Sequence, residues 1–307
     1  MSERDPEVVP FFEGRERFLA LVAELRPELH RYCARMLGSV ADAEDVVQDT
    51  LARAFYALAG LQQLPPLKPW LFRIAHNRAV DQLRSYEYRM LEPLQEVHDF
   101  NVESVNPEDA LAREQATALA IARFSELAPQ QRSAVILKDV LGHSVEEIAE
   151  LLELSVAAVK AALHRGRKRL AVLALEAAPE TMPRAASPAL VRFVTLFNAR
   201  DWDALRALLA SDVELDLVSR AQRRGANVSS YFSNYSALRG WHFAPGFVDG
   251  REAILVYREA RDLSPRYFIE LTLDGNQVRF IRDFYFVPYI LADAQVERVV
   301  EMNTRSV

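Results

Sequence analysis

The stretch HSVEEIAELLELSVAAVKAALHRGRKRL, residues 143–170, decides the fold of the middle of the chain. In its first half, apolar residues recur at the spacing of one helix face: Val145, Ile148, Ala149 and Leu152. Ser155 follows after a break of two residues, and its hydroxyl oxygen can cap the start of a second helix. Two amphipathic helices joined by so short a turn predict a helix-turn-helix.

The second helix of this pair separates an apolar face from a cationic one. The predicted inner face consists of Val156, Val159, Leu163, Gly166 and Leu170. The predicted outer face carries Ala157, Ala158, Ala161, His164, Arg165 and Lys168, with Lys160 and Arg167 on its flanks. Small residues near the start allow close approach to a DNA groove, and the cations further along reach phosphates or base edges. A plain helical hairpin with a basic C-terminal end is the alternative, but the short turn and the cationic face coincide.

A second helical pattern, DAEDVVQDTLARAFYAL at residues 42–58, gathers acidic side chains on one face. The apolar side is expected to contain Val47, Leu51, Ala54, Phe55 and Leu58. The opposite side is expected to expose Asp42, Asp45 and Asp49, with Gln48 beside them and Val46 partly exposed. Such a face either keeps the protein soluble or binds a basic partner.

A third helical pattern, PWLFRIAHNRAVDQLRS at residues 69–85, carries a polar stripe. At 3.6 residues per turn, one line of the helix contains Trp70, Arg73, Asn77, Asp81 and Arg84. An aromatic ring, guanidinium groups and an amide together can stack on a base, bind phosphate and read a base edge. The alternative is an ordinary solvated helix face.

The composition limits the class of protein. A chain of 307 residues has room for about two domains. Its net charge of −6 argues against a protein that coats nucleic acid, but local DNA binding depends on where the cations lie. The single cysteine, Cys33, excludes an intramolecular disulfide and fits a reducing compartment. Because residues 1–20 lack the apolar core of a signal peptide and no apolar run approaches a membrane span, we expect a cytoplasmic protein.

Composition also divides the chain into blocks. The expected segments are a helical domain at 15–94, a polar linker at 95–109, a helical domain at 110–175, a proline-containing linker at 176–188, and a last domain at 189–300. Helical patterns at 189–199 and 201–210 open the last domain, and runs rich in β-branched and aromatic residues follow. Asp-Gly in LDGNQV, residues 273–278, predicts a hairpin. The expected fold is two all-α domains followed by an α+β domain with a mostly antiparallel sheet.

Taken in order, residues 42–58, 69–84 and 127–170 resemble the extracytoplasmic-function (ECF) sigma factors, the two-domain initiation factors of bacterial RNA polymerase. The resemblance covers nearly all of residues 15–175. It implies that 15–94 is sigma region 2 and 110–175 is sigma region 4. It also implies core RNA polymerase (the β′ clamp helices and the β subunit) and promoter DNA as partners.

In that family the first stretch docks on the β′ clamp helices, the second melts the promoter and reads the −10 element, and the helix-turn-helix reads the −35 element. The residues that match polymerase contacts are Asp45, Gln48 and Asp49. Those that match or flank −10 contacts are Trp70, Arg73 and Asn77, of which Asn77 matches a residue that holds a flipped base. On the recognition helix, Lys160, His164 and Arg165 match DNA contacts of the family, and Arg167 is expected near phosphate. Lys168 of the outer face is a further DNA-binding candidate. Where many members read Val-Lys-Ser-Arg-Leu, residues 159–163 read VKAAL, so the −35 preference or affinity should differ.

The chain after residue 188 is similar to the SnoaL-like branch of the NTF2-like α+β cone folds, best over residues 191–216. The resemblance implies a regulatory domain that acts in cis and binds a small ligand or a protein. Enzymes of that branch use an acid–base group inside the cone, and the candidates here are Asp216, His242 and Asp283. Periodicity does not show which of them points inward. The aromatic residues that either line a pocket or form the core are Tyr231, Phe232, Tyr235, Trp241, Phe243 and Phe247.

We expect no catalysis, metal or cofactor, because the sequence has no His/Cys cluster with metal spacing and no Gly-rich phosphate loop. The predicted function is promoter-specific initiation by an ECF-type sigma factor that its SnoaL-like domain regulates. One alternative is a one-component regulator with a helix-turn-helix and a ligand-binding domain, which would need neither 42–58 nor 69–84. The other alternative is an NTF2-like enzyme with a DNA-binding appendage.

Overall fold

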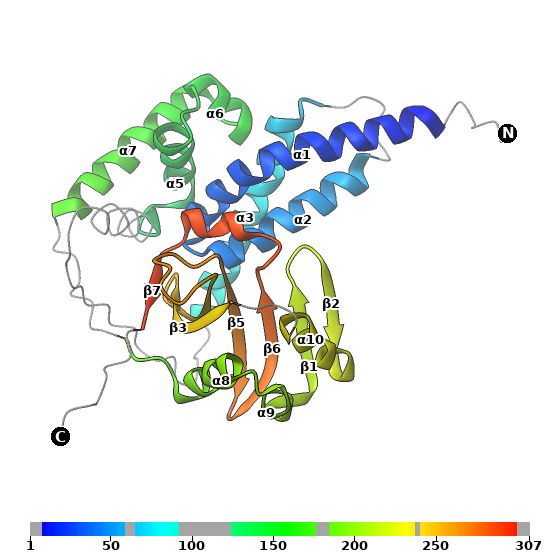
Figure 1. Ribbon diagram of the computed structural model, residues 1–307. Coiled ribbons are helices and arrows are strands. Elements are labelled where there is room, and N and C mark those ends of the chain that lie inside the picture. Colours follow the sequence, from blue (N-terminus) through cyan, green and yellow to red (C-terminus); the bar gives the residue numbers. More distant parts are fainter. Residues whose placement is uncertain (1–7, 59–64, 92–123, 176–183, 237–239, 300–307) are drawn as a thin grey trace. The chain divides into compact units, whose positions relative to one another are not determined.

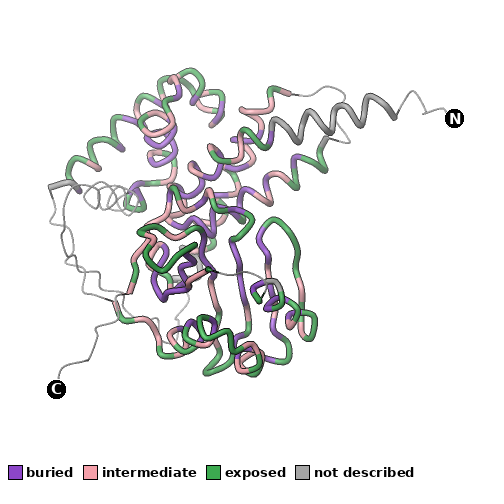
Figure 2. Tube along the Cα trace, viewed as in Figure 1, coloured by how far each residue is buried: buried purple, intermediate pink, exposed green. Residues whose placement is uncertain are grey.

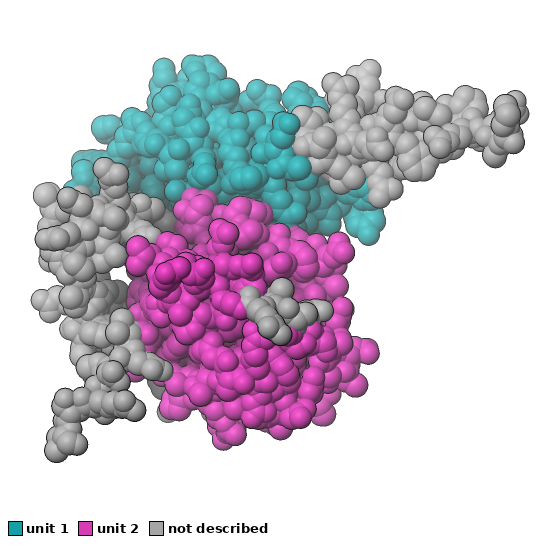
Figure 3. Space-filling model, in the orientation of Figure 1, with its two compact units in different colours: residues 1–99, 116–178 teal, residues 100–115, 179–307 magenta. Residues whose placement is uncertain are grey.

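The structure is a computed structural model that describes residues 8–58, 65–91, 124–175, 184–236 and 240–299. The chain divides into two compact units (Figure 3). The helical unit comprises residues 1–99 and 116–178, and the sheet unit comprises residues 100–115 and 179–307. The expected linker at 95–109 and most of the linker at 176–188 lie outside the described residues, as does the start of the expected domain at 110–175.

Three helices form the first block of the helical unit: α1 (Val8–Leu37), α2 (Val40–Leu58) and α3 (Leu67–Leu91) (Figure 1). Gly38 ends α1 with a φ of +74°, and its amide donates to the carbonyl of Ala34 over 2.7 Å. Ser39 then accepts a hydrogen bond from the amide of Asp42, which caps the start of α2. The sequence thus carries its own signals for turning from α1 into α2.

The second block contains α5 (Pro129–Val135), a π-helical turn η1 (Ile136–Val140), α6 (Val145–Leu152) and α7 (Val156–Leu175). The predicted helix-turn-helix is confirmed by α6 and α7. A capping box between Ser144 and Glu147 begins α6, and Glu153, with a φ of 55°, ends it in the left-handed region. Ser155 caps α7 by accepting from the amide of Ala158 over 3.1 Å.

Gly166 lets α7 approach α5 closely. A Cβ atom at this position would lie 2.7 Å from the Cγ2 atom of Val135 and 3.3 Å from the carbonyl oxygen of Gln131. The helix therefore needs a residue without a side chain at this point, which fixes how the recognition helix sits on its support.

The sheet unit begins with α8 (Pro188–Ala199) and α9 (Trp202–Ala207) and continues with strands. The strands are β1 (Leu209–Leu217), β2 (Ala221–Arg224), β3 (His242–Val248), β4 (Arg251–Tyr257), β5 (Tyr267–Asp274), β6 (Gln277–Asp283) and β7 (Val296–Arg298). Between them lie η2 (Gly225–Ser230) and α10 (Tyr231–Ser236) after β2, and η3 (Pro288–Asp293) after β6. The strand order is β2-β1-β6-β5-β4-β3-β7. Every neighbouring pair is antiparallel except β1 and β6, so the predicted α+β class and mostly antiparallel sheet are confirmed.

Two local expectations in the sheet unit have different outcomes. The hairpin at residues 273–278 is confirmed, because Asp274 pairs with Gln277 and Gly275 takes a φ of +58°. The helix expected at 201–210 is wrong over its last residues, since α9 ends at Ala207 and β1 begins at Leu209. Leu209 pairs with Val278 of β6, and this sheet contact overrides the helical pattern.

The core of the sheet unit is aromatic. Buried positions run along β3 and β4 (Figure 2), and α8 packs against these strands. Phe197 of α8 lies with its ring centroid 4.3 Å from that of Phe243 and 5.0 Å from that of Tyr235. Of the aromatics left open between core and pocket, all are buried except Trp241, which is partly buried. They form core. None of the described helices is long and apolar enough to cross a membrane.

Candidate nucleic-acid interface

The cationic face of α7 is exposed and borders a groove of about 490 Å³. The groove is lined by Lys138, Val145, Lys160, Leu163, His164, Arg167 and Lys168. Arg165 is also exposed on α7 but lies outside the lining. Sequence periodicity missed Lys138, which comes from η1, because no helical repeat connects it with α7. Its Nζ donates to the carbonyl of His143 over 3.0 Å, which holds the ammonium beside the groove.

Arg167 has an orientation that a carboxylate of η1 fixes. Its Nε donates to Asp139 over 2.9 Å. Hydrogen bonding to Asp139 raises the pKa of Arg167. Since both side chains stay largely exposed, the guanidinium remains accessible to a phosphate while Asp139 sets its direction.

The predicted inner face of α7 is confirmed in its central part. Val159, Leu163 and Gly166 are buried, and Leu170 is half-buried. Val156 was expected to be buried, and this is wrong: 37% of it is exposed. It is the first residue of α7 and lies nearly a turn before Val159, where burial begins.

The polar stripe of α3 lies on the outside of the helical unit. Asn77, Asp81 and Arg84 are exposed, whereas Trp70 and Arg73 are half-buried. The opposite side of α3 buries Leu71, Phe72, Ala75 and Ala79. Asp81 forms ion pairs with its helical neighbours Arg78 and Arg84, at 3.6 and 4.0 Å. The stripe therefore offers an indole, a guanidinium and an amide along one line, as predicted.

The acidic face of α2 is narrower than predicted. Asp45 is exposed, and Gln48 and Asp49 are half-buried. Asp42 and Val46 were expected to be exposed and partly exposed, and both are buried, at 8% and 4%. Asp42 lies in the first turn of α2, where its amide donates to the hydroxyl of Ser39, and α2 packs against α1.

Two further features of α2 depart from the helical pattern. Phe55 was expected on the buried side, yet 38% of it is exposed, and Tyr56 beside it is 79% exposed. Glu44 is fully buried, accepts from Nε2 of Gln48 over 3.1 Å and is ion-paired with Arg26 of α1. Sequence reasoning missed Glu44 because its partner lies on another helix.

Asp49 is not an isolated carboxylate. It accepts from Nε of Arg53 over 2.9 Å and forms an ion pair with Arg78 of α3. The acid expected to meet a basic partner is thus already shared between two guanidinium groups. Asp45 is the more exposed carboxylate of the face.

The two helical blocks meet across a polar interface. His76, next to Asn77 on α3, points inward, and its Nδ1 lies 2.7 Å from the hydroxyl of Tyr32 and 3.2 Å from that of Ser133. Tyr32 in turn donates to Ser133 over 3.0 Å. Burial lowers the pKa of His76 to about 4, so the ring is neutral at physiological pH.

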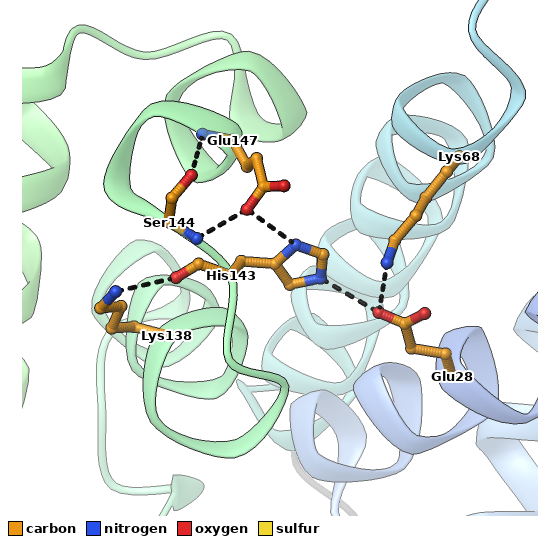
Figure 4. A network of polar contacts seen from close by, with 6 residues as sticks. All are labelled: Glu28, Lys68, Lys138, His143, Ser144 and Glu147. Atoms are coloured by element: carbon orange, nitrogen blue, oxygen red, sulfur yellow. Dashed lines mark hydrogen bonds and ion pairs between the residues drawn. The ribbon is translucent and has the colours of Figure 1, made fainter.

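A second polar cluster connects the loop before α6 with α1 and α3 (Figure 4). Nε2 of His143 lies 3.1 Å from Glu28, and Nζ of Lys68 lies 2.9 Å from the same carboxylate oxygen. The hydrogen bond from His143 and the charge of Lys68 lower the pKa of Glu28, although partial burial opposes them. Nδ1 of His143 is 3.8 Å from Glu147, the residue that completes the capping box of α6.

In the sheet unit, Asp283 points into the core. Its Oδ2 accepts from Tyr235 over 2.6 Å and from Tyr231 over 2.8 Å, and its Oδ1 accepts from the amide of Tyr285. Tyr267 lies 2.8 Å from the hydroxyl of Tyr235. Burial raises the pKa of Asp283, and the tyrosine hydroxyls oppose this. Both carboxylate oxygens thus have protein donors.

The other two acid–base candidates are not brought to Asp283. Asp216 lies opposite Arg282 in the β1–β6 register and is ion-paired with it at 3.3 Å, whereas Asp283 lies opposite Leu217. Neighbouring positions of a strand point to opposite faces. His242, at the start of β3, lies opposite Tyr257, and burial followed by the charge of Arg298 lowers its pKa. Among the residues that the structure describes, no group of three or more His, Cys, Asp or Glu side chains is arranged to hold a metal.

Two family models match the helical part of the chain. The model described as Sigma-70 region 2 matches residues 21–88, and the model described as Sigma-70, region 4 matches residues 119–170. The first range includes the acidic face of α2 and the stripe of α3. The second includes the helix-turn-helix with its cationic groove.

Individual relatives extend these matches. The ECF RNA polymerase sigma factor SigG of Mycobacterium tuberculosis is 32% identical over 231 residues, which are 66% of this chain and 62% of SigG. The match thus spans less than two thirds of that relative. SigW of Bacillus subtilis, another ECF RNA polymerase sigma factor, is 29% identical over 164 residues, covering 51% of this chain and 88% of SigW. Among solved structures, the ECF sigma factor SigJ of M. tuberculosis is 22% identical, covering 86% of this chain and 95% of SigJ with a TM-score of 0.36.

Proposed function

The chain belongs to the ECF sigma factors, and we propose that it directs bacterial RNA polymerase to specific promoters. The observation that carries this proposal is the presence of three separate surfaces in one helical unit: the cationic groove beside α7, the polar stripe of α3 and the acidic face of α2. A protein that only binds DNA needs the first of them. A factor that also melts a promoter and recruits a polymerase needs all three. Its action on polymerase and chromosomal DNA would take place in the cytoplasm.

Region 4 would bind the −35 element through α7. Lys160, His164 and Lys168 line the groove together with Lys138, and Arg165 stands exposed on the same helix. Lys138 and Arg167 are positioned by protein contacts, to the carbonyl of His143 and to Asp139, which suits them to bind phosphate in a fixed register. No contact within the described residues fixes the exposed Arg165 in this way, and we assign it to base reading.

Region 2 would supply the −10 and polymerase contacts. Asn77 is exposed beside the inward-pointing His76, so its amide is presented by a well-packed part of α3. Trp70 and Arg73 extend the same line and would add stacking and backbone contact. On α2, the face that contains Asp45, Gln48 and Asp49 would meet the basic β′ clamp helices, with Asp45 as the most exposed of the three.

For the sheet unit we propose regulation without catalysis. A general acid or base must reach a substrate, but Asp283 is 1% exposed and both of its oxygens accept hydrogen bonds within the core. Asp216 is held by Arg282, with both side chains largely buried. A small ligand or a protein that binds this unit would act on the sigma module through the tether that joins α7 to α8, which raises the local concentration of one unit near the other.

Transcription with purified core polymerase tests the proposal. The full chain should associate with core polymerase and produce promoter-specific transcripts, and a chain that ends at residue 178 should differ several-fold in transcript yield. A chain that protects duplex DNA but does not bind core polymerase would support the one-component regulator instead. Equal transcription by the shortened and full chains, with and without cell extract, would remove the regulatory role from the sheet unit.

A further inference from the structure

The surfaces proposed to read the two promoter elements are held together by an ion pair. Nη1 of Arg73, on the polar stripe of α3, lies 2.6 Å from Oε1 of Glu153. Glu153 is the left-handed residue that ends α6, in the turn of the helix-turn-helix. The contact therefore joins the stripe of region 2 directly to the start of the recognition helix of region 4.

In this arrangement the two DNA-reading surfaces lie too close together to contact both promoter elements at the same time. The −10 and −35 elements lie about 25 base pairs apart, or about 85 Å along B-form DNA. Arg165 follows Glu153 by twelve positions, nine of them within α7, so it lies within about 25 Å of Glu153. With Arg73 at 2.6 Å from Glu153, Arg73 and Arg165 cannot reach both elements at once. Region 4 has to leave region 2 before the whole promoter can be read.

Neighbouring contacts define where the two blocks meet. Glu28 and Lys68 of region 2 hold His143, which precedes α6 (Figure 4). Arg132 of α5 donates to the carbonyl of Met36 near the end of α1, a favourable position for a cation. Since these contacts fix α6 against α3, the ion pair between Glu153 and Arg73 forms with little additional loss of conformational entropy.

We propose that Glu153 occupies the DNA-binding guanidinium of Arg73 in the free protein and thereby acts as an intramolecular competitor of promoter DNA. We call this the closed arrangement. A carboxylate and a phosphate are alternative anionic partners for the same guanidinium, and the charge of the Glu153 carboxylate at Nη1 both neutralises Arg73 and repels a phosphate brought beside it. Binding of DNA or polymerase favours the open arrangement, because only there are Arg73 and the recognition helix free to separate. The part played by DNA rests on the proposed function, whereas the closed arrangement itself does not.

A distance measurement on the full chain tests the closed arrangement without polymerase or DNA. Single-molecule energy transfer between dyes at Ala57→Cys on α2 and Val172→Cys on α7 would report the separation of the two blocks. Both positions are exposed, and the native Cys33 is fully buried. Because the Arg73–Glu153 pair is largely exposed, Glu153→Lys should lower the ratio of closed to open molecules by about two- to five-fold. Glu150→Lys, on the same helix and with the same change of charge, should leave it unchanged.

The exchange Arg73→Glu with Glu153→Arg restores an ion pair of opposite polarity and should restore the closed population. An unchanged ratio in Glu153→Lys, or a failed restoration, would show that the Arg73–Glu153 pair does not hold the closed arrangement and would overturn the proposal. Binding of a single-stranded −10 oligonucleotide then tests the competition. Glu153→Lys should bind it about two- to five-fold more tightly than Glu150→Lys. Equal binding by the two variants, with a changed ratio, would overturn the competition and leave the ion pair as a purely structural contact.

Discussion

Tyr235 donates a hydrogen bond to Asp283 over 2.6 Å inside the sheet unit, and its hydroxyl also meets that of Tyr267. A buried carboxylate is costly unless donors surround it, and this tyrosine supplies one donor while joining a second hydroxyl to the network. The relationship explains how an ionisable group is kept in an aromatic core. It also indicates a structural role for the residue that sequence reasoning had placed among the acid–base candidates.

Tyr235→Phe should destabilise the sheet unit by about 1–3 kcal/mol, because Asp283 loses a donor and the hydroxyl of Tyr267 loses its partner. Amide hydrogen exchange in β5 and β6 would measure the change, since the two units of the chain need not unfold together. Tyr285→Phe is the matched control, because 42% of Tyr285 is exposed. Unchanged protection in Tyr235→Phe would show that the network contributes nothing to stability.

Asp45→Lys combined with Asp49→Lys should weaken binding to core polymerase by about tenfold or more, because two charges then repel a basic partner. The single change Asp45→Lys is the cleaner test, since Asp49 also holds Arg53 and Arg78 in the fold. Glu24→Lys, an exposed position of α1, controls for the change in net charge. Fluorescence anisotropy would measure the affinity of each variant for core polymerase. Equal affinities of Asp45→Lys and Glu24→Lys would refute the docking assignment.

Arg165→Ala and Lys138→Ala should affect DNA binding in different ways. If Arg165 reads a base, its loss costs about 1–3 kcal/mol on the preferred −35 sequence and relaxes the preference at one position. Loss of Lys138 should weaken binding equally across sequences and reduce the salt dependence by about one unit of slope. Titrations at several salt concentrations would separate the two patterns. If Lys138→Ala relaxed the sequence preference and Arg165→Ala weakened binding uniformly, the two assigned roles would be reversed.

Asn77→Ala should leave duplex binding intact and prevent promoter opening, because the amide is proposed to hold a base only after it leaves the helix. Permanganate footprinting of the complex with polymerase would detect the open region. A template with a pre-melted −10 region should restore transcription in part. If the variant opens a linear duplex as well as the native chain, Asn77 has no part in melting.

Much of the local structure in both units follows from nearby sequence. Ser155 caps α7 and Gly275 forms the hairpin turn, as predicted, because caps and turns depend on residues a few positions apart. The outward stripe of α3 follows from helical spacing alone. The central inner face of α7 is equally readable, since Val159 and Leu163 repeat at the period of the helix.

Only the tertiary structure determined which residues from other elements lie beside each predicted surface. Helical spacing alone placed Asp42 on the outside, but Asp42 is buried in the fold. Spacing also gave no reason to join Lys138 to the groove beside α7. The choice among Asp216, His242 and Asp283 needed the register of β1 on β6, because a shift by one residue exchanges the two faces of a strand. The pairing of Arg73 with Glu153 joins positions 80 residues apart. Short-range periodicity determines which side of a helix is polar, whereas only the packed chain determines which partner that side meets.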